Sequence, residues 1–165
     1  VLPEEFMRGG GCFAPESVVT ALRDGEAVPT RVCDVRAGDV LITASGPAAV
    51  RCVVLTKCEG GRAMLTRLPG GLELTEWHPV LDARGTWRFP HMLGDLVCRR
   101  CPYVVNMVLE RGHVLVVNGV GCVTLGHGLS GPVVGHDFWG TDAVLNVLRA
   151  QPGWAAGRVV LDSSA

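Results

Sequence analysis

Apolar runs in this chain are short, and glycine or proline separates many of them. The 165 residues include 22 glycines and 10 prolines, and 48% of the residues are hydrophobic. Average proteins contain about 7% glycine and about 5% proline, so this chain is rich in both. Because glycine and proline end regular elements and form turns, the pattern favours many short strands over long helices. The length corresponds to one ordinary domain.

Two segments have the pattern of a β-hairpin. The first is predicted to turn at Asp24-Gly25, a preferred pair for tight hairpin turns, and the second at residues 83–85. Each hairpin is followed by a related phrase, residues 35–40 and residues 91–96, in which Gly-Asp precedes an apolar residue. Repeated sequence usually means a repeated structural unit, so we predict a duplicated β-subdomain.

Further elements complete the predicted all-β pattern. Short strands are predicted at residues 41–43, 50–55, 63–68, 72–74, 104–109 and 113–117. One helix is predicted over residues 142–150, with Thr141 as its amino-terminal cap and Pro152-Gly153 after its end. Its apolar residues fall on one face, so the helix is expected to dock on the β core.

Charge and hydropathy argue against two kinds of partner. The formal net charge is -1 and charged residues make up 19% of the chain, which is not the basic surplus of a nucleic-acid-binding domain. The best apolar stretch, residues 114–125, is interrupted by Asn118, Gly119 and Gly121. It falls short of the roughly 18 consecutive apolar residues that a membrane span needs. We therefore expect no nucleic-acid partner and no membrane span.

The chain has seven cysteines, an odd number, whereas a fully paired disulfide framework uses an even number. We therefore expect reduced thiols, an intracellular, reducing compartment, and at least one thiol free to act as a nucleophile. Free cysteine usually packs as a small hydrophobic residue. We expect this structural role for most of Cys33, Cys52, Cys58, Cys98 and Cys101.

Three consecutive glycines lead directly into Cys12. A cysteine sulfur lies within reach of the preceding carbonyl carbon, so Cys12 is placed to attack Gly11 and convert the amide into a thioester. An ordinary peptide bond resists this N-to-S acyl shift because resonance stabilises it, with a rotation barrier of roughly 18–20 kcal/mol. The fold must therefore supply strain at Gly11, a donor for the developing oxyanion and an acid for the departing nitrogen.

The segment Thr75-x-x-His78, followed by Pro79, offers the acid. Proline disfavours helix at the preceding residue, so His78 is expected to be held extended. The ordinary pKa of histidine, near 6.5, allows His78 to donate a proton near neutral pH. The Thr75 hydroxyl is three residues away and can hydrogen-bond the same peptide group. A histidine used only for packing is the alternative interpretation.

These residues together resemble the Hint family, which comprises hedgehog autoprocessing domains, inteins and bacterial intein-like domains. The residues that carry the resemblance are Gly11-Cys12-Phe13 ahead of a hairpin, Thr75-x-x-His78, Tyr103 to Leu109, and His113 to Val120. The tail, residues 122–141, most resembles the Hint branch found beside von Willebrand A domains. The likeness spans residues 12 to about 150, nearly the whole chain.

The resemblance implies an all-β, pseudo-two-fold, horseshoe-shaped Hint fold with a C-terminal helical extension. It divides the chain into an upstream flank at residues 1–11, an autoprocessing domain at 12–128 and an extension with one helix at 129–165. It also implies a covalently attached upstream domain as partner, of the von Willebrand A type. No cofactor and no metal are implied.

The resemblance further implies self-cleavage at Gly11-Cys12, with the thioester then resolved by hydrolysis or by another nucleophile. By the family pattern Cys12 is the nucleophile, His78 protonates the scissile nitrogen and Thr75 assists at that peptide. His113 corresponds to a histidine of the late family motif. The sequence departs from the pattern at Asn106, where many members carry a functional aspartate.

Cys122 is the internal candidate for a second thiol that receives the acyl group. It lies near the position of a late cysteine in hedgehog domains, although at a different spacing. A core cysteine in the apolar run 120–125 is an equally open interpretation. His127, flanked by glycines, is either a later base or a turn residue, and we favour the turn.

Full protein splicing is not expected. Inteins end in His-Asn followed by Cys, Ser or Thr, because the asparagine cyclises and the next residue captures the acyl group. Here Asn118-Gly119 is followed by Val120 and Gly121, and the chain continues. We interpret Asn118-Gly119 as a strand-to-turn pair.

Two metal patterns and two other functions remain as alternatives. Cys98-x-x-Cys101 resembles half of a zinc site or a redox pair, but the sequence offers no second pair at matching spacing. His127 or His136 near the processing site is a weaker metal candidate. A non-catalytic Hint-like module would use the β horseshoe for binding or structure. A Cys-His hydrolase would need a helix amino terminus or a cation that lowers the pKa of Cys12.

Overall fold

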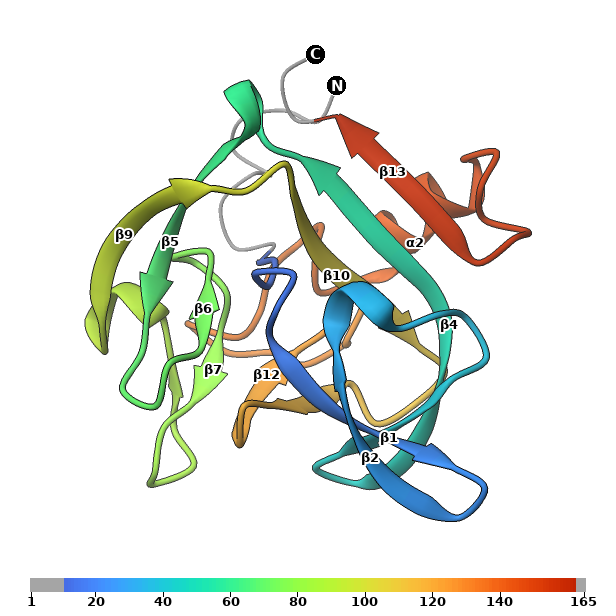
Figure 1. Ribbon diagram of the computed structural model, residues 1–165, viewed down its shortest axis with the longest axis horizontal. Helices are drawn as coiled ribbons and strands as arrows, with labels where there is room; N and C mark the ends of the chain where they lie inside the picture. Colours follow the sequence, from blue (N-terminus) through green and yellow to red (C-terminus); the bar gives the residue numbers. More distant parts are fainter. Residues whose placement is uncertain (1–10, 163–165) are drawn as a thin grey trace.

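The computed structural model describes residues 11–162, which form strands and turns with one helix near the end (Figure 1). The elements in chain order are β1 (Val18–Arg23), β2 (Glu26–Arg31), the 3-10 turn η1 (Val32–Asp34), β3 (Val40–Thr43), β4 (Gly46–Lys57), η2 (Glu59–Gly61), β5 (Arg62–Arg67), β6 (Glu73–Leu74), β7 (Val80–Leu81), β8 (Trp87–Arg88), η3 (Pro90–Met92), β9 (Asp95–Arg100), β10 (Tyr103–Leu109), β11 (Val114–Val117), β12 (Val120–Val123), α2 (Asp142–Arg149) and β13 (Arg158–Asp162). The predicted upstream flank, except Gly11, lies outside the described residues.

Two sheets organise the described strands. One hydrogen-bonded path runs β10-β4-β3-β11-β12-β7-β8, with β1 and β2 joined at β3 and β13 joined at β4. The second sheet has the order β6-β5-β9. These pairings are antiparallel, except that β13 runs parallel to β4.

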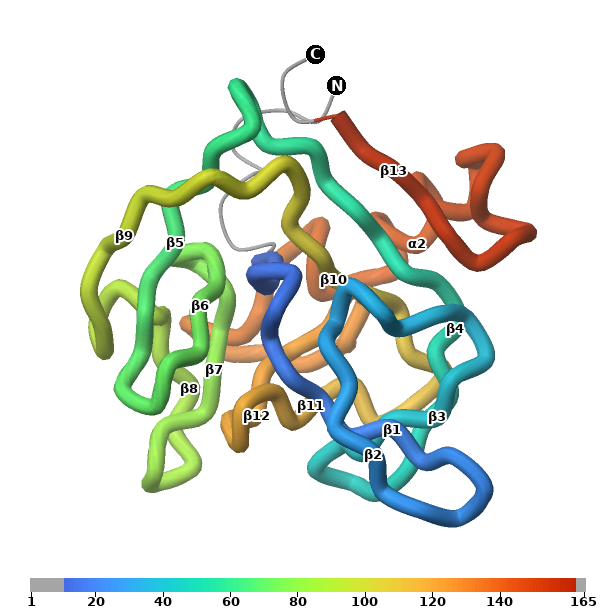
Figure 2. The backbone as a smooth tube through the Cα atoms, viewed as in Figure 1, coloured from blue at the N-terminus to red at the C-terminus, as the bar shows by residue number. Residues whose placement is uncertain are grey.

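The two halves of the chain follow one plan, which agrees with the predicted duplication. In the first half a hairpin, β1 and β2, leads through η1 to β3 and the long strand β4. In the second half a hairpin, β7 and β8, leads through η3 to β9 and the long strand β10. β4 and β10 pair along their length and join the halves at the centre (Figures 1 and 2). The chain thus has the predicted all-β, horseshoe-shaped Hint fold.

The main apolar cluster lies between the strands of the two halves. Phe13, Leu41, Leu74, Met107 and Leu115 are among its fully buried side chains. Removing such side chains from water contributes about 1.5–3 kcal/mol each, so the cluster is a principal source of stability. Because Phe13 belongs to it, the residues just before Phe13 are fixed to the core.

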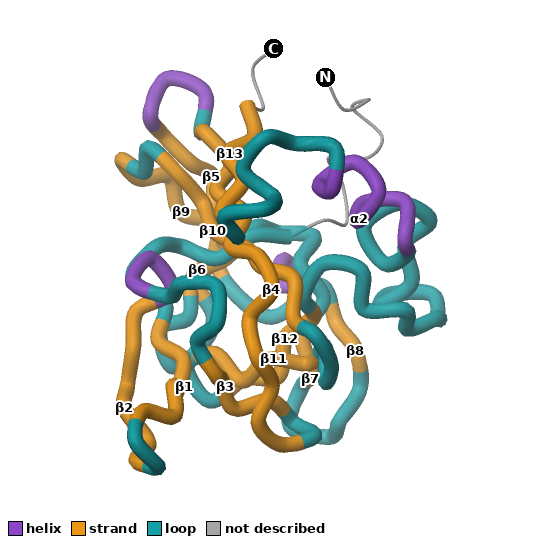
Figure 3. Tube along the Cα trace, turned by 90° about the vertical axis from the view of Figure 1, so that its right-hand side faces the viewer, coloured by secondary structure: helices purple, strands orange, loops and turns teal. Residues whose placement is uncertain are grey.

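A second cluster lies between α2 and the strands β4 and β13. Val144 and Leu148 of α2 pack with Val54 of β4 and Val159 of β13. Figure 3 shows α2 as a helix at the edge of the strands. Thr141 caps the helix, since its hydroxyl oxygen accepts a hydrogen bond from the Ala143 N–H at 3.2 Å. The predicted helix, its cap and its docking on the β core are therefore confirmed.

The first predicted hairpin turn is also confirmed, because Asp24 and Gly25 have φ angles of 53° and 80°. Those left-handed values suit a two-residue hairpin turn. The sequence missed β9, β12 and β13. Strand β9 is mostly exposed and ends in Arg99-Arg100, so it shows none of the apolar alternation that identifies a buried strand. No helix in residues 11–162 is long and apolar enough to cross a membrane.

Candidate active site

Phe13 fixes the backbone immediately after Cys12. Its N–H donates to the Val105 carbonyl at 2.7 Å, and its own carbonyl accepts from the Val105 N–H at 2.9 Å. It also forms an isolated bridge to Leu74 of β6. Its buried ring lies 4.4 Å from the His78 ring, centroid to centroid. The preceding peptide, Gly11-Cys12, therefore has a defined position between β6 and β10.

Both polar atoms of the Gly11-Cys12 peptide are hydrogen-bonded to side chains. The Cys12 N–H donates to Thr75 Oγ1 at 2.9 Å, and Asn106 Nδ2 donates to the Gly11 carbonyl. The Asn106 side-chain oxygen, Oδ1, accepts from the Met107 N–H at 2.8 Å, which orients the side-chain amide. Thr75 also donates its backbone N–H to the Cys12 carbonyl at 3.0 Å. The scissile peptide predicted from the sequence is thus held from both sides.

The His78 side chain is fully buried and lies against Gly11. A Cβ added to Gly11 would overlap Cβ, Cγ and Nδ1 of His78, so any larger residue would displace the ring. His78 Nε2 lies 2.7 Å from the Val123 carbonyl oxygen, which can only accept, so the neutral ring carries its proton on Nε2. Within the described residues, Nδ1 is buried without a hydrogen-bond partner.

Burial lowers the pKa of His78 to about 4, while the backbone of Val123 and Cys12 opposes the shift and the nearby His127 adds to it. The sequence predicted a proton donor near neutral pH. At pH 7 the buried ring is instead neutral, with an open lone pair on Nδ1. His78 must therefore accept a proton before it can donate one.

Cys12 is half-buried, and burial raises the pKa of its thiol to about 12. A hydrogen bond with the side chain of Thr56 lowers this pKa, whereas the neighbouring Cys58 and Cys101 raise it. The thiol is therefore protonated at pH 7, and a thiolate forms only as a base removes the proton. A Cys-His hydrolase would need the opposite shift, so the environment of Cys12 argues against that alternative.

The other two predicted site residues make their described contacts elsewhere. Cys122 is fully buried in the main apolar cluster, its thiol donates to the Val120 carbonyl at 3.4 Å, and burial raises its pKa. The backbone carbonyl of His113 accepts from the Thr124 N–H at 3.1 Å. Thr124 follows Val123, whose carbonyl orients His78. Neither side chain forms a described hydrogen bond with the Gly11-Cys12 peptide.

The late histidines orient loops. His127 Nδ1 accepts from the Leu129 N–H at 2.9 Å, which agrees with the turn interpretation. His136 Nδ1 accepts from the Phe138 and Trp139 N–H groups at 3.1 and 3.0 Å. Among residues 11–162, no group of three or more histidine, cysteine or acidic side chains is arranged to hold a metal ion.

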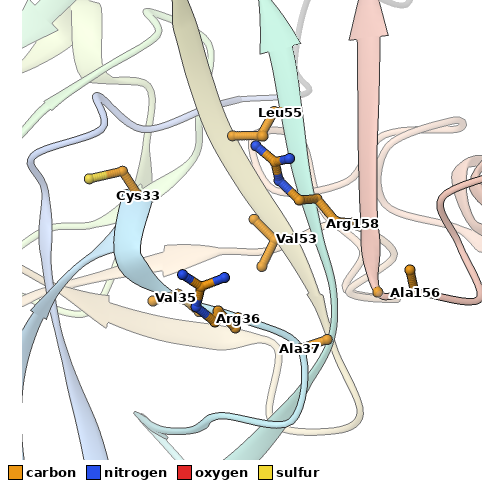
Figure 4. Close-up of a pocket in the computed structure, with 9 residues that line it drawn as sticks. Cys33, Val35, Arg36, Ala37, Val53, Leu55, Ala156 and Arg158 are labelled. Atoms are coloured by element: carbon orange, nitrogen blue, oxygen red, sulfur yellow. The ribbon is translucent and has the colours of Figure 1, made fainter.

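A cavity of about 550 Å³ lies between η1, β4 and the residues that lead into β13. Val53 and Leu55 line it together with Arg36 and Arg158 (Figure 4). None of its lining residues belongs to the set around the Gly11-Cys12 peptide. The candidate active site is therefore the peptide and its partners.

Sequence reasoning missed several residues around this peptide. Asn106 was noted only as a departure from the family pattern, although it supplies the donor for the Gly11 carbonyl. A single asparagine in the apolar run 103–109 was the available signal, because a buried amide needs hydrogen-bond partners. Nothing in the sequence indicated that Thr56, Cys58 and Cys101 lie beside Cys12.

Comparison with known families agrees with the fold. A family model described as Vint, a Hint-domain, matches residues 11–165. Because the match covers almost the whole chain, the protein belongs to this Hint-domain family. The match includes residues 129–165, which we expected to form an extension. No significant match exists among curated proteins.

Solved intein structures share the fold at low sequence identity. The gp41-1 intein is 12% identical with a TM-score of 0.50, and the alignment covers 70% of this chain and 99% of that chain. A DnaB intein from Synechocystis sp. PCC 6803 is 14% identical with a TM-score of 0.50, covering 69% and 98%. An Ssp DnaB mini-intein variant is 14% identical with a TM-score of 0.52, covering 71% and 95%. These likenesses concern the fold alone.

The buried, neutral His78 predicts a pH-dependent loss of stability. Between the ordinary pKa near 6.5 and the folded-state pKa of about 4, the unfolded chain binds a proton that the folded chain does not. The free energy of unfolding should therefore fall as the pH falls through this window, with His78 contributing on the order of 2 kcal/mol by pH 4.5.

Urea unfolding at pH 7 and pH 4.5, in a Cys12→Ala background that keeps the chain intact, measures this loss. His78→Asn should remove the His78 share of the pH dependence. His91→Asn, which changes an exposed histidine, should leave the dependence unchanged. An identical loss in the His78→Asn and parent proteins would contradict the assignment.

Proposed function

We propose that this Hint domain cleaves its own chain at Gly11-Cys12 by an N-to-S acyl shift. Family membership supports a self-processing domain in general. The observation that carries the specific proposal is the environment of one peptide group: its oxygen accepts from Asn106, its nitrogen donates to Thr75, and His78 lies against its glycine. A peptide used only for structure would not need three polar side chains.

In the first step the Cys12 sulfur attacks the Gly11 carbonyl carbon and transfers its proton to His78. The raised pKa of the thiol makes a free thiolate rare at pH 7, so proton removal accompanies attack. The neutral ring has an unprotonated Nδ1 buried beside Gly11, which is the base available at this peptide. Nε2 stays bound to the Val123 carbonyl, so the ring keeps its orientation while Nδ1 gains the proton.

In the second step the bond between the Gly11 carbon and the Cys12 nitrogen breaks. His78 returns the proton to the departing nitrogen, which gives a free amine and a thioester with no net proton gained or lost. The Thr75 hydroxyl already contacts this nitrogen, and a hydroxyl both accepts and donates, so it can follow the change from amide to amine.

Negative charge develops on the Gly11 oxygen during both steps. Asn106 Nδ2 already donates to that oxygen, and Asn106 itself is 2% exposed. A fixed donor in a water-excluded site stabilises a developing oxyanion more than water does. Asn106 is therefore the proposed oxyanion donor. An amide can donate this hydrogen bond, whereas an ionised aspartate can only accept one.

The thioester is then resolved by water or by an external nucleophile, which releases whatever precedes Cys12. We propose a covalently attached upstream domain as the released partner, of the von Willebrand A type found beside the Hint branch that the tail resembles. Cys122 is left out of the scheme, because its thiol is enclosed in the core and its hydrogen bond goes to Val120.

Cleavage without splicing is supported by the use of Asn118. Asn118 and Gly119 have φ angles of 48° and 79° and form the turn between β11 and β12, whose strands pair up to Val117↔Val120. The Asn118 side-chain oxygen accepts from the Val18 N–H at 2.7 Å. The contacts of the Asn118 side chain thus serve the hairpin and its contact to β1, which supports a structural role over the cyclisation that releases the chain in inteins.

The proposal is tested by incubating the full chain at neutral pH with a thiol or hydroxylamine. Intact mass should report Cys12-dependent release of residues 1–11, and hydroxylamine should trap Gly11 as a hydroxamate. Cys12→Ala should release nothing, whereas Cys33→Ala, which changes an exposed cysteine, should release the segment at the parent rate. A folded parent with the same mass stability as Cys12→Ala would instead support the non-catalytic Hint-like module.

Asn106→Ala should slow thioester formation by about 10²–10³-fold, the usual effect of removing one oxyanion donor. The rate of hydroxylamine-dependent release measures the effect. Asn146→Ala, at an exposed helix position, is the matched control and should retain the parent rate. A parent-like rate in folded Asn106→Ala protein would exclude Asn106 as the donor.

A further inference from the structure

Three cysteines from distant parts of the sequence meet beside the Gly11-Cys12 peptide. Cys12, Cys58 and Cys101 belong to one small cluster with Ala14, Leu65 and Val104. Cys58 directly follows β4, and Cys101 lies between β9 and β10. The central pairing of β4 with β10 therefore carries two additional thiols to the proposed nucleophile.

The backbone holds Cys58 and Cys101 next to each other. The Cys58 N–H donates to the Pro102 carbonyl at 2.9 Å, and the Cys101 N–H donates to the Gly61 carbonyl at 2.8 Å. The Cys58 thiol donates to the Thr56 carbonyl and the Cys101 thiol to the Tyr103 carbonyl at 3.0 Å. The two thiols also interact electrostatically with each other, and both are free. Two cysteines on hydrogen-bonded neighbouring backbone segments and in one side-chain cluster are close enough to be candidates for a disulfide.

The two thiols differ in ways that suit different roles. Cys58 is half-buried, so a disulfide formed on Cys12 can reach it. Cys101 is 1% exposed. Burial raises the pKa of its thiol, and the nearby Arg99 partly opposes this rise. Cys98, the partner that the sequence suggested for Cys101, is exposed and lies opposite Met64 in the β5–β9 ladder.

We propose that Cys58 and Cys101 are a resident dithiol that returns an oxidised Cys12 to its thiol form. The oxidant considered is a small disulfide, such as oxidised glutathione, which converts Cys12 into a mixed disulfide and releases one thiol. The Cys58 sulfur attacks the Cys12 sulfur and expels the second small thiol, which leaves a Cys12-Cys58 disulfide. The Cys101 sulfur then attacks the Cys58 sulfur, forms the Cys58-Cys101 disulfide and expels the Cys12 thiol.

The steps balance in atoms and electrons. The mixed disulfide is reduced by two electrons to two thiols, and the Cys58-Cys101 pair is oxidised by the same two electrons. Closure between held neighbours is favoured over disulfides with free small thiols, because the effective concentration of a positioned group is high. One dithiol supplies one reduction, which matches a domain that cleaves once. In this sense the inference rests on the proposed function.

The test uses the full chain and oxidised glutathione. The protein is treated with oxidised glutathione, freed of it, and then given hydroxylamine without any thiol. The parent should still release residues 1–11, and its peptide map should contain the Cys58-Cys101 disulfide. Cys58→Ser should keep glutathione on Cys12, Cys101→Ser should hold a Cys12-Cys58 disulfide, and both should release the segment at least about tenfold more slowly than the parent.

Controls separate this inference from the proposed cleavage. Cys33→Ser, at an exposed cysteine, should behave as the parent, and a reductant should restore release in the Cys58 and Cys101 variants if they are folded. Parent-like release by both oxidised variants, or glutathione retained on Cys12 of the parent, would overturn the relay. If no protein releases the segment even with reductant, the cleavage proposal fails, while the parent's disulfide map still decides the relay.

Discussion

The position of the whole site depends on the two backbone hydrogen bonds between Phe13 and Val105. They attach the start of the described chain to β10, and the buried Phe13 ring fills the main core between the halves. Cys12 directly precedes Phe13, and the carbonyl that Asn106 contacts belongs to Gly11, the residue before Cys12. Because Asn106 follows Val105 on the same strand, a single pairing register places the oxygen of the Gly11-Cys12 peptide against its donor.

The nitrogen side of the peptide is organised from β6 in the same way. Phe13 bridges Leu74, and Thr75, the next residue, contacts Cys12 through its hydroxyl and its backbone N–H. Arg99 donates to Glu73 at 3.2 Å and to Glu16 at 2.7 Å, which links β6 to the segment that follows Cys12. The site therefore lies where short strands from different parts of the fold meet, and a duplicated β architecture creates such a meeting point.

The site includes polar groups that the fold alone would not favour. His78 is fully buried with an unpartnered Nδ1 among the described residues, and Asn106 interrupts an apolar strand. An unsatisfied buried polar group costs about 1–3 kcal/mol. Proteins commonly accept such costs at functional positions and recover stability elsewhere. Here the apolar clusters that contain Phe13 and Leu148 provide the compensating burial.

Much of the fold could be predicted from the sequence because turns and caps are local. Asp24-Gly25 and Thr141 act through neighbouring residues, so their patterns are visible without tertiary structure. Strand β13 was missed because its partner, β4, lies about one hundred residues away and the pairing is parallel. The peptide, Thr75 and His78 were predicted together. The low pKa of His78 could not be predicted, because it depends on burial. The approach of Cys58 and Cys101 to Cys12 could not be predicted either, because it depends on long-range strand pairing.

The proposed site depends most directly on the Cys12 amide being held by Thr75 while Phe13 is paired with β10. Amide hydrogen exchange, followed by NMR without any added nucleophile, measures this for each N–H separately. We expect the Cys12 N–H to exchange at least about 100-fold more slowly than in an unfolded peptide, and Thr75→Ala to abolish that protection while Phe13 stays protected. Exchange of the Cys12 N–H at the unfolded rate, with Phe13 protected in the same protein, would contradict the account.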